Sequence, residues 1–437
     1  MLFRQGQICR GRDARAVPLE DRLRPWRRAQ HQGDERRRRT FALGQAVIRP
    51  HRRLLAAACA LLLPIGPASG DDGKGRQREP VRVLLTGDVS FGENYQADAA
   101  RRGRANILEQ HGYDYTIERL APLLRRADYT IVNLETPVTA MERSPLADSG
   151  KDYLHWSHVD KTPGRLTAYG VDAVGLANNH TLDFGQQGLL DSFAALKRYG
   201  IAAFGAGRDA EDAAAPLVRV LRVGNREVTI GVIASFEKRA SYEKFGFYAG
   251  HDKPGTNPTD TRAIAEQVKE LRRRNPGILI LSYAHWGSNY TWRSPDQQAA
   301  AREMIDAGVD VVVGHHGHTL QEVERYRGKW IVYGLGNFMF NANGRFASYP
   351  EVTPYGLAME LVFADKGGAL DAEIRLYPIR SDNLKTGYQP SVADGKDAEA
   401  AFGEMLRRSA LGADQKLVSR GADAIGPFLR LSQPIAP

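Results

Sequence analysis

The chain contains very little cysteine: Cys9 and Cys59 are the only two among its 437 residues. Everything after residue 59 therefore lacks both disulfides and thiolate metal ligands. A metal site in that part of the chain has to use imidazole, carboxylate or amide groups.

The chain also lacks net charge over most of its length, although the total is +9. Residues 1–70 hold 15 basic and 5 acidic residues, which leaves 45 of the 60 basic and 46 of the 51 acidic residues for the rest. The body carries no global field for a polyanion, so an acidic ligand would need local arginines or a metal. Nucleic-acid binding would rest on residues 1–53 alone, and we expect no such partner.

The apolar run Leu54–Leu63 is too short to span a bilayer as a helix. Arginines precede this run, and prolines and small residues up to Gly70 follow it. This three-part pattern is typical of a secretory signal peptide. We expect 47–70 to be that peptide, 1–46 to be an overextended or disordered basic N-terminus, and 71–80 to be a linker. The protein would then be exported, to the periplasm or the cell exterior, with membrane association left open.

From residue 81, apolar β-type runs alternate with helical patterns, and no repeat or low-complexity segment follows residue 75. Such alternation predicts a largely parallel sheet covered by helices. A later β-rich stretch predicts a second sheet packed on the first, which gives an α/β, four-layer αββα sandwich over 81–380. Residues 381–437 would form a C-terminal extension with a helix. The predicted helices are Ile117–Arg126, one opening at Thr162-Pro163, Gly188–Tyr199, Thr261–Arg274, Pro295–Ala307 and Ala398–Arg408.

Three imidazoles occur in the run Gly314-His315-His316-Gly317-His318, straight after the apolar segment Val309–Val313. Four other predicted strands also end in polar groups, and ligands of open α/β sheets bind at such carboxyl ends. Each group alone could be an ordinary turn or core residue. Together they predict one site for one or two divalent ions, Mn, Zn, Fe or Mg. The predicted metal ligands are Asp88, Glu135, Asn179, His285, His316 and His318.

The strings that carry these residues resemble the CapA family of capsule and poly-γ-glutamate synthesis proteins, which is similar to the calcineurin-like metallophosphoesterases. They lie within residues 81–365 and are Leu85-Thr86-Gly87-Asp88-Val89, Asn133-Leu134-Glu135-Thr136-Pro137, Ala177 to Gly185, His285-Trp286-Gly287, Gly314 to His318 and Tyr333 to Phe338. The resemblance implies the αββα fold, an extracytoplasmic location and a role in anionic envelope polymers.

The chain departs from the phosphoesterase pattern at two positions. Ser90 stands where that pattern has a histidine, and Glu135 stands where a bridging aspartate is usual. The site could therefore bind a single ion, or two loosely. The register between His315 and His316 also stays open.

Other residues are candidates for catalysis or for substrate binding. His180 would act as proton donor, with Asp183 fixing its tautomer. Asn337 would contact the ligand or brace a ligating histidine. Tyr290 and Arg293 would offer an aromatic wall and a cation to an acidic polymer.

Two functions remain open at this point. The first is a metal-dependent hydrolase, phosphoesterase-like, that acts on an anionic exopolymer or a phosphoester. The second is a non-catalytic subunit that binds polymer for export or anchoring within a membrane-bound synthesis complex. The missing imidazole at Ser90 favours the second, and the other ligands favour the first.

Overall fold

The computed structural model describes residues 79–367 and 369–432. The expected N-terminal segment and signal peptide, 1–46 and 47–70, lie outside the described residues, as does nearly all of the expected linker. Within the described part of the chain, no helix is long and apolar enough to cross a membrane.

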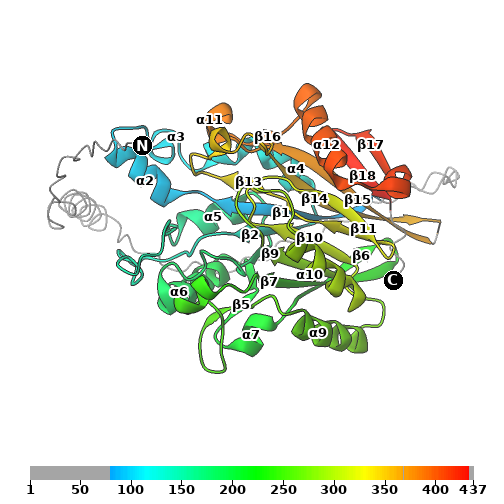
Figure 1. The fold of residues 1–437 in the computed structure, drawn as a ribbon, viewed down its shortest axis with the longest axis horizontal. Coiled ribbons are helices and arrows are strands. Elements are labelled where there is room, and N and C mark those ends of the chain that lie inside the picture. The colour runs from blue at the N-terminus through cyan, green and yellow to red at the C-terminus, as the bar shows by residue number, and fades with distance from the viewer. Residues whose placement is uncertain (1–78, 368, 433–437) are drawn as a thin grey trace, which may run out of the picture. The chain divides into compact units, whose positions relative to one another are not determined.

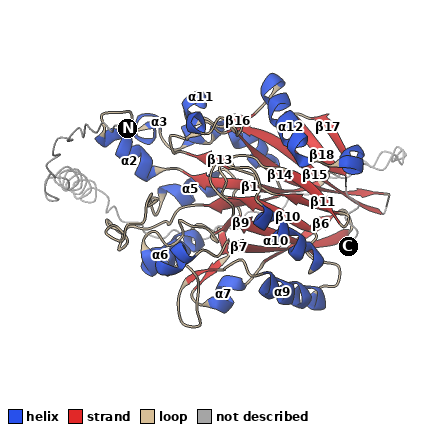
Figure 2. Cartoon of the chain, in the orientation of Figure 1, coloured by secondary structure: helices blue, strands red, loops and turns tan. Residues whose placement is uncertain are grey.

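Two large sheets form the centre of the fold (Figures 1 and 2). The first has ten strands, in the order β17-β18-β15-β14-β1-β2-β3-β4, with β13 beside β1 and β16 beside β15. Its strands are β1 Val81–Ser90, β2 Tyr129–Leu134, β3 Ala173–Gly175, β4 Ala202–Phe204, β13 Asn337–Phe340, β14 Tyr355–Lys366, β15 Ala369–Arg380, β16 Ser391–Val392, β17 Val418–Ala422 and β18 Pro427–Ser432.

The second sheet has six strands, in the order β11-β12-β10-β9-β7-β6. Its strands are β6 Leu217–Val223, β7 Arg226–Phe236, β9 Leu279–His285, β10 Val311–His315, β11 Val323–Tyr326 and β12 Lys329–Val332. A separate pair joins β5 Ala206–Gly207 and β8 Gly255–Thr256. A tight turn at Gly224-Asn225 joins β6 to β7, with Val223 paired to Arg226.

Side-chain alternation along β9 and β10 places the second sheet between two apolar layers. Leu281 and Val313 belong to the core shared with the first sheet, whereas Ile280 and Val312 pack in a separate core with α9 and α10. Successive strand residues point to opposite faces, so both strands are buried along their whole length. The Tyr283 hydroxyl also donates to the Thr86 carbonyl and ties β9 to β1.

Helices cover the two sheets, which confirms the predicted αββα arrangement (Figure 1). The helices are α2 Glu93–Arg101, α3 Ile107–His111, α4 Ala121–Arg126, α5 Lys161–Ala168, α6 Gly185–Arg198, α7 Ala210–Ala214, α8 Ala240–Lys244, α9 Thr261–Arg274, α10 Pro295–Asp306, α11 Asn383–Thr386 and α12 Gly395–Ser409. Past residue 380, β18 and β17 extend the first sheet beside β15, and α12 is the helix expected there.

The helix predicted over Ile117–Arg126 is shorter than expected. A 3-10 turn spans Glu118–Leu120, and α4 begins only at Ala121. Pro122 has no backbone N–H, and its ring would clash with the carbonyl four residues earlier, so an α-helix cannot run through it from Glu118. The prediction was therefore wrong for the first turn.

Gly87 allows the loop at Gly336 to pack directly against β1, the strand that carries Asp88. The Asp88 N–H donates to the Gly336 carbonyl at 2.9 Å. A Cβ on residue 87 would lie 1.8 Å from that carbonyl oxygen. The contact therefore requires glycine at position 87.

We expect Gly87→Ala to lower the free energy of unfolding by about 3 kcal/mol, at the upper end of overpacking costs, since backbone must move to admit the methyl group. Gly403→Ala is the matched control, because residue 403 lies inside α12 with open space around its Cα. That change should be neutral or stabilising by up to about 1 kcal/mol. Urea unfolding of both variants measures the difference, and equal effects would contradict the packing described.

Candidate metal centre

The predicted site residues come from both sheets rather than from one. Asp88 lies in β1, Glu135 follows β2, and Asn179 with His180 follows β3. His285 ends β9, and His315 ends β10, in the second sheet. The pairs β1–β2, β2–β3 and β9–β10 are all parallel. The carboxyl ends of the two sheets meet, and the site lies where they meet.

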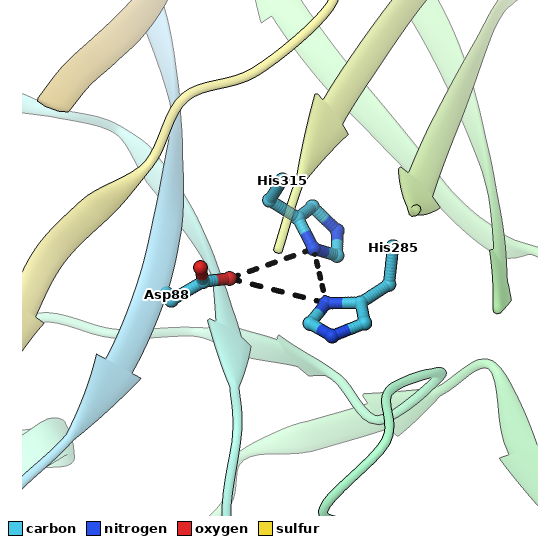
Figure 3. Close-up of side chains that lie close together, drawn as sticks. All are labelled: Asp88, His285 and His315. Carbon is cyan, nitrogen blue, oxygen red and sulfur yellow. Dashed lines mark hydrogen bonds and ion pairs between the residues drawn. The ribbon is translucent and has the colours of Figure 1, made fainter. Parts of the chain in front are cut away.

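His315 lies in the cluster as well as His316, so both of the alternatives that the sequence left open are close to the other candidate ligands. It shares strand parity with Val311 and Val313, which face the inter-sheet core. His285 has the same relation to Leu281 and Tyr283 in β9. Figure 3 shows both imidazoles facing Asp88. His316 also enters the cluster, because the chain turns after β10 with φ 94° at that residue.

Asp88 is fully buried and lies among polar groups. Its Oδ1 accepts from Asn133 Nδ2 at 2.8 Å, and its Oδ2 accepts from the His316 N–H at 3.2 Å. His318 Nδ1 lies 3.4 Å from Oδ2, and His315 Nδ1 lies 3.6 Å from Oδ1. Burial raises the pKa of Asp88 to about 7, and these hydrogen bonds oppose the shift only in part.

The carboxylate of Glu135 has fewer hydrogen bonds than the carboxylate of Asp88. It is fully buried, and neither carboxylate oxygen has a hydrogen-bond partner among the described residues. His285 Nε2 lies 3.7 Å and His180 Nε2 lies 3.8 Å from Oε1. Burial, followed by the nearby Asp88 and Asp183 carboxylates, holds the pKa of Glu135 well above its usual value.

The imidazole rings of the site are buried and contact one another and neighbouring amide groups. His285 Nδ1 and His315 Nδ1 are 2.8 Å apart, and His285 Nε2 lies 2.5 Å from Asn179 Oδ1. His318 Nδ1 lies 2.8 Å from Asn337 Oδ1. Burial lowers the pKa of each ring, to about 3 for His315 and about 4 for His318. Unprotonated imidazoles are the form that ligates metals.

The donor set fits a divalent cation. Three groups of carboxylate and imidazole atoms lie within 4.8 Å of one another: Asp88 with His285 and His315, Glu135 with His285 and His316, and Asp88 with Glu135 and His318. Because members are shared, these groups form one cluster. In the described part of the chain, His315 Nε2 and His316 Nδ1 are buried without a partner, as are both Glu135 oxygens. Buried polar atoms in proteins are nearly always paired, so these atoms suit a ligand that accepts their lone pairs.

His180 and Asp183 stand beside the cluster in the arrangement expected for a proton-transfer pair. His180 Nδ1 lies 2.6 Å from Asp183 Oδ2, so this nitrogen carries the proton and Nε2 is left to accept. Lys151 Nζ lies 2.6 Å from Asp183 Oδ1, and its side chain is only 4% exposed. His155, stacked on His180 with centroids 3.3 Å apart, bonds the Glu135 carbonyl and Tyr95.

A fourth donor group, His155 with His180 and Asp183, has a cation of its own. The Lys151 ammonium already neutralises Asp183, and both His155 nitrogens are engaged. This group therefore fits a divalent ion less well than the other three. Neither Lys151 nor His155 was a sequence candidate, since both lie in a loop without a local pattern.

The predicted substrate residues are only partly brought together. Tyr290 lies beside the site, with its ring centroid 5.7 Å from that of His318. Asn337 is buried and holds His318. Arg293 instead faces Glu322 at 3.9 Å and lies over the Tyr333 ring, away from the cavity described next. The cation next to Tyr290 is Arg345, which the sequence did not single out.

An open cavity of about 1140 Å³ leads to the cluster. Asn179, His180, His316 and His318 line it, while Asp88, Glu135, His285 and His315 lie deeper. The same cavity is lined by seven lysines and arginines but only two aspartates. A local excess of positive charge therefore surrounds the entrance, although the chain after residue 70 is nearly neutral.

The region that holds these residues matches a known protein family. The family described as "Bacterial capsule synthesis protein PGA_cap" matches residues 82–342. The chain belongs to this family. The resemblance to CapA proteins seen in the sequence is thereby confirmed, and the match includes every predicted metal ligand.

Individual relatives of this PGA_cap protein support the assignment. It is 26% identical to "Capsule biosynthesis protein CapA" of Bacillus anthracis over 78% of this chain and 76% of that one. It is 35% identical to a "Probable polyglutamine synthesis accessory protein" of Mycobacterium tuberculosis over 60% of this chain and 75% of that one. "PGA biosynthesis protein CapA" of Bacillus subtilis is 31% identical, over 60% and 63%.

Among solved structures, the calcineurin-like phosphoesterase YfkN of Bacillus subtilis covers 76% of this chain and 97% of its own. The two share 14% identity with a TM-score of 0.41, which is too low to bear on activity.

The buried Lys151–Asp183 pair should be needed for the stability of this PGA_cap protein. We expect Lys151→Met to lower the free energy of unfolding by about 3–5 kcal/mol, because Asp183 would lose its counter-charge in a buried position. Lys366→Met is the control, since its pair with Asp371 is exposed and should contribute below about 1 kcal/mol. Denaturant titration compares the two, and a small effect of both would show that the buried pair does not hold the site together.

Proposed function

We propose that this protein is a divalent-metal-dependent hydrolase of capsule or poly-γ-glutamate metabolism that acts on an anionic cell-envelope polymer. Membership of the PGA_cap family and the names of its relatives support the capsule role. The buried cluster of carboxylates and imidazoles supports the metal. The basic cavity above it supports an acidic substrate.

The single observation that carries the proposal is the state of Glu135. A carboxylate that is fully buried and has no hydrogen-bond donor is costly, unless a cation balances it or it takes up a proton. Two unprotonated imidazoles lie within 4 Å of it, and a second buried carboxylate, Asp88, is close by. This combination is typical of a metal centre rather than of a structural core.

The residues of the chain divide the chemistry between them. Asp88, Glu135, Asn179, His285, His316 and His318 would hold one or two ions, with His315 as a further ligand. A divalent ion there supplies polarisation of the scissile group and charge stabilisation as the bond breaks. His180 would take up a proton at Nε2 and pass it to the leaving group, while Asp183 holds its other nitrogen.

We also propose that the protein works outside the cytoplasm, next to a membrane-bound polymer synthesis system. The support is the signal-peptide pattern around Leu54–Leu63 and the synthesis roles printed in the names of its relatives.

Elemental analysis of the purified protein tests the metal assignment. We expect one or two equivalents of a divalent metal in the wild type and a clear loss in His316→Ala and Asn179→Ala. His251→Ala is the matched control, because that imidazole is 95% exposed and pairs with Asp252 on the surface. Unchanged metal content in the first two variants would show that the metal, if any, binds elsewhere.

Hydrolysis assays on poly-γ-glutamate and on a phosphodiester test the reaction itself. We expect His180→Ala to keep its metal but to lose about 10²- to 10⁴-fold in kcat, the usual range for a general acid or base. Equal loss of metal and activity would instead make His180 a ligand.

One observation favours the non-catalytic alternative. Ser90, which stands in place of an imidazole, is fully buried, and its hydroxyl accepts from the Gly92 N–H at 3.1 Å. It closes a turn after β1 and does not supply the imidazole that the phosphoesterase pattern has at this position. A protein that retains metal and polymer but cleaves neither substrate would be a binding subunit of this kind.

A further inference from the structure

The basic cavity contains a cation whose surroundings differ from those of its neighbours. Four of the seven lysines and arginines that line it are already paired with a carboxylate: Arg101 and Arg102 with Asp98, Lys151 with Asp183, and Arg239 with Glu237. Within residues 79–367 and 369–432, no carboxylate forms an ion pair with Arg104, Lys244 or Arg345. These three side chains are therefore available to an anion that enters from solvent.

Arg345 is the one of the three that aromatic rings hold in place. Its Cζ lies 5.3 Å from the ring centre of Tyr153 and 5.6 Å from that of Tyr290. A guanidinium held against aromatic rings has a restricted orientation and keeps its planar fork of N–H donors. Arg345 also forms a hydrogen bond with the Tyr290 side chain, which restricts it further. Arg345 thus presents a partly preorganised fork at the mouth of the cavity.

Tyr290 anchors this arrangement to the protein. It is 4% exposed, stacks on Tyr349 with centroids 5.0 Å apart, and meets Phe346 edge to face at 5.2 Å. The Tyr290 ring centroid also lies 5.7 Å from that of His318. Tyr290 therefore lies between Arg345 and His318, which is one of the candidate metal ligands.

Tyr153 and Tyr290 both adopt backbone conformations that non-glycine residues avoid. Their φ values are 54° and 55°, in the left-handed region. Such a conformation is strained for a residue that carries a side chain, and strain of this kind clusters at ligand sites. Tyr153 is also 58% exposed, which is unusual for a large aromatic ring. Strain, exposure and an unpaired cation thus coincide at one place in the cavity.

We propose that Arg345, between Tyr153 and Tyr290, is the subsite that binds the carboxylate side group of the polymer residue next to the scissile bond. This assignment rests on the proposed function and extends it, because it makes Arg345 the residue that determines specificity for a polyanion. The guanidinium fork matches a carboxylate through two parallel hydrogen bonds. Arg104 and Lys244, on other parts of the cavity lining, supply charge to neighbouring units of the same chain.

Direct binding of a γ-linked glutamate oligomer to the metal-loaded full chain tests this subsite without requiring turnover. We expect Arg345→Ala to weaken binding, measured by calorimetry, about 10- to 100-fold, the loss typical of a hydrogen bond to a charged group. The affinity of Arg345→Lys should lie between those of the wild type and Arg345→Ala, because lysine keeps the charge but lacks the planar fork of donors. Thermal unfolding should be nearly unchanged, since Arg345 is exposed.

Arg198→Ala is the matched control. Its guanidinium also lies over a tyrosine, Tyr199 at 5.5 Å, and it is outside the cavity. We expect its affinity for the oligomer to equal that of the wild type. The same oligomer with its side carboxylates amidated should bind weakly and without dependence on Arg345.

The outcomes separate this proposal from the proposed function. Unchanged affinity in Arg345→Ala, or no binding of the oligomer to the wild type, would overturn the subsite whatever the metal and hydrolysis assays give. Arg345-dependent binding without hydrolysis would support the subsite and contradict the hydrolase. Arg345-dependent binding of a glycerol-phosphate oligomer, with none of the glutamate oligomer, would overturn the carboxylate assignment.

Discussion

Two carboxylates buried where the two sheets meet, Asp88 and Glu135, set the main physical constraint on this structure. In the part of the chain that the structure describes, neither forms an ion pair with a lysine or arginine, and Glu135 has no hydrogen-bond donor at all. Burying such groups costs several kcal/mol per ion unless a counter-charge is close. The arrangement is stable when the carboxyls are protonated or when a cation lies between them and the imidazoles. The imidazoles beside Glu135 supply further ligands, which favours the cation.

The distribution of positive side chains follows from this constraint. Lys151 is a buried ammonium beside the cluster, and it pairs with Asp183 rather than with Glu135. It thereby fixes the partner of His180 and leaves the ligand atoms uncovered. The arginines lie further out, along the cavity that leads to the cluster. The arginines therefore lie away from the position where a metal fits, along the cavity through which we propose that an anionic polymer passes.

The layer order and most of the candidate ligands could be predicted from the sequence. Alternating apolar β runs and amphipathic helices gave the layer order, because both strand faces are buried in the second sheet. Strand ends indicated the candidate ligands, although the structure brings them together from two sheets. His315 could have been found from strand parity, since it lies two residues beyond Val313 on the same face of β10.

Other features had no local signal. Helix α2 buries Glu93, Gln96 and Ala99, so it lacks the apolar period by which a helix is recognised. Lys151 and Arg345 reach the site from loops far away in sequence, and only tertiary packing brings them there. Arg293 was inferred from its nearness to Tyr290 in the sequence, but the loop directs the two side chains to different partners.

Anomalous X-ray scattering from crystals grown with Zn²⁺ tests the central claim most directly. The account predicts a zinc peak about 2.0–2.2 Å from a Glu135 carboxylate oxygen and from nitrogen atoms of the surrounding histidines. A second peak near Asp88 would indicate two ions. A peak only between His155, His180 and Asp183, or none near Glu135, would contradict it.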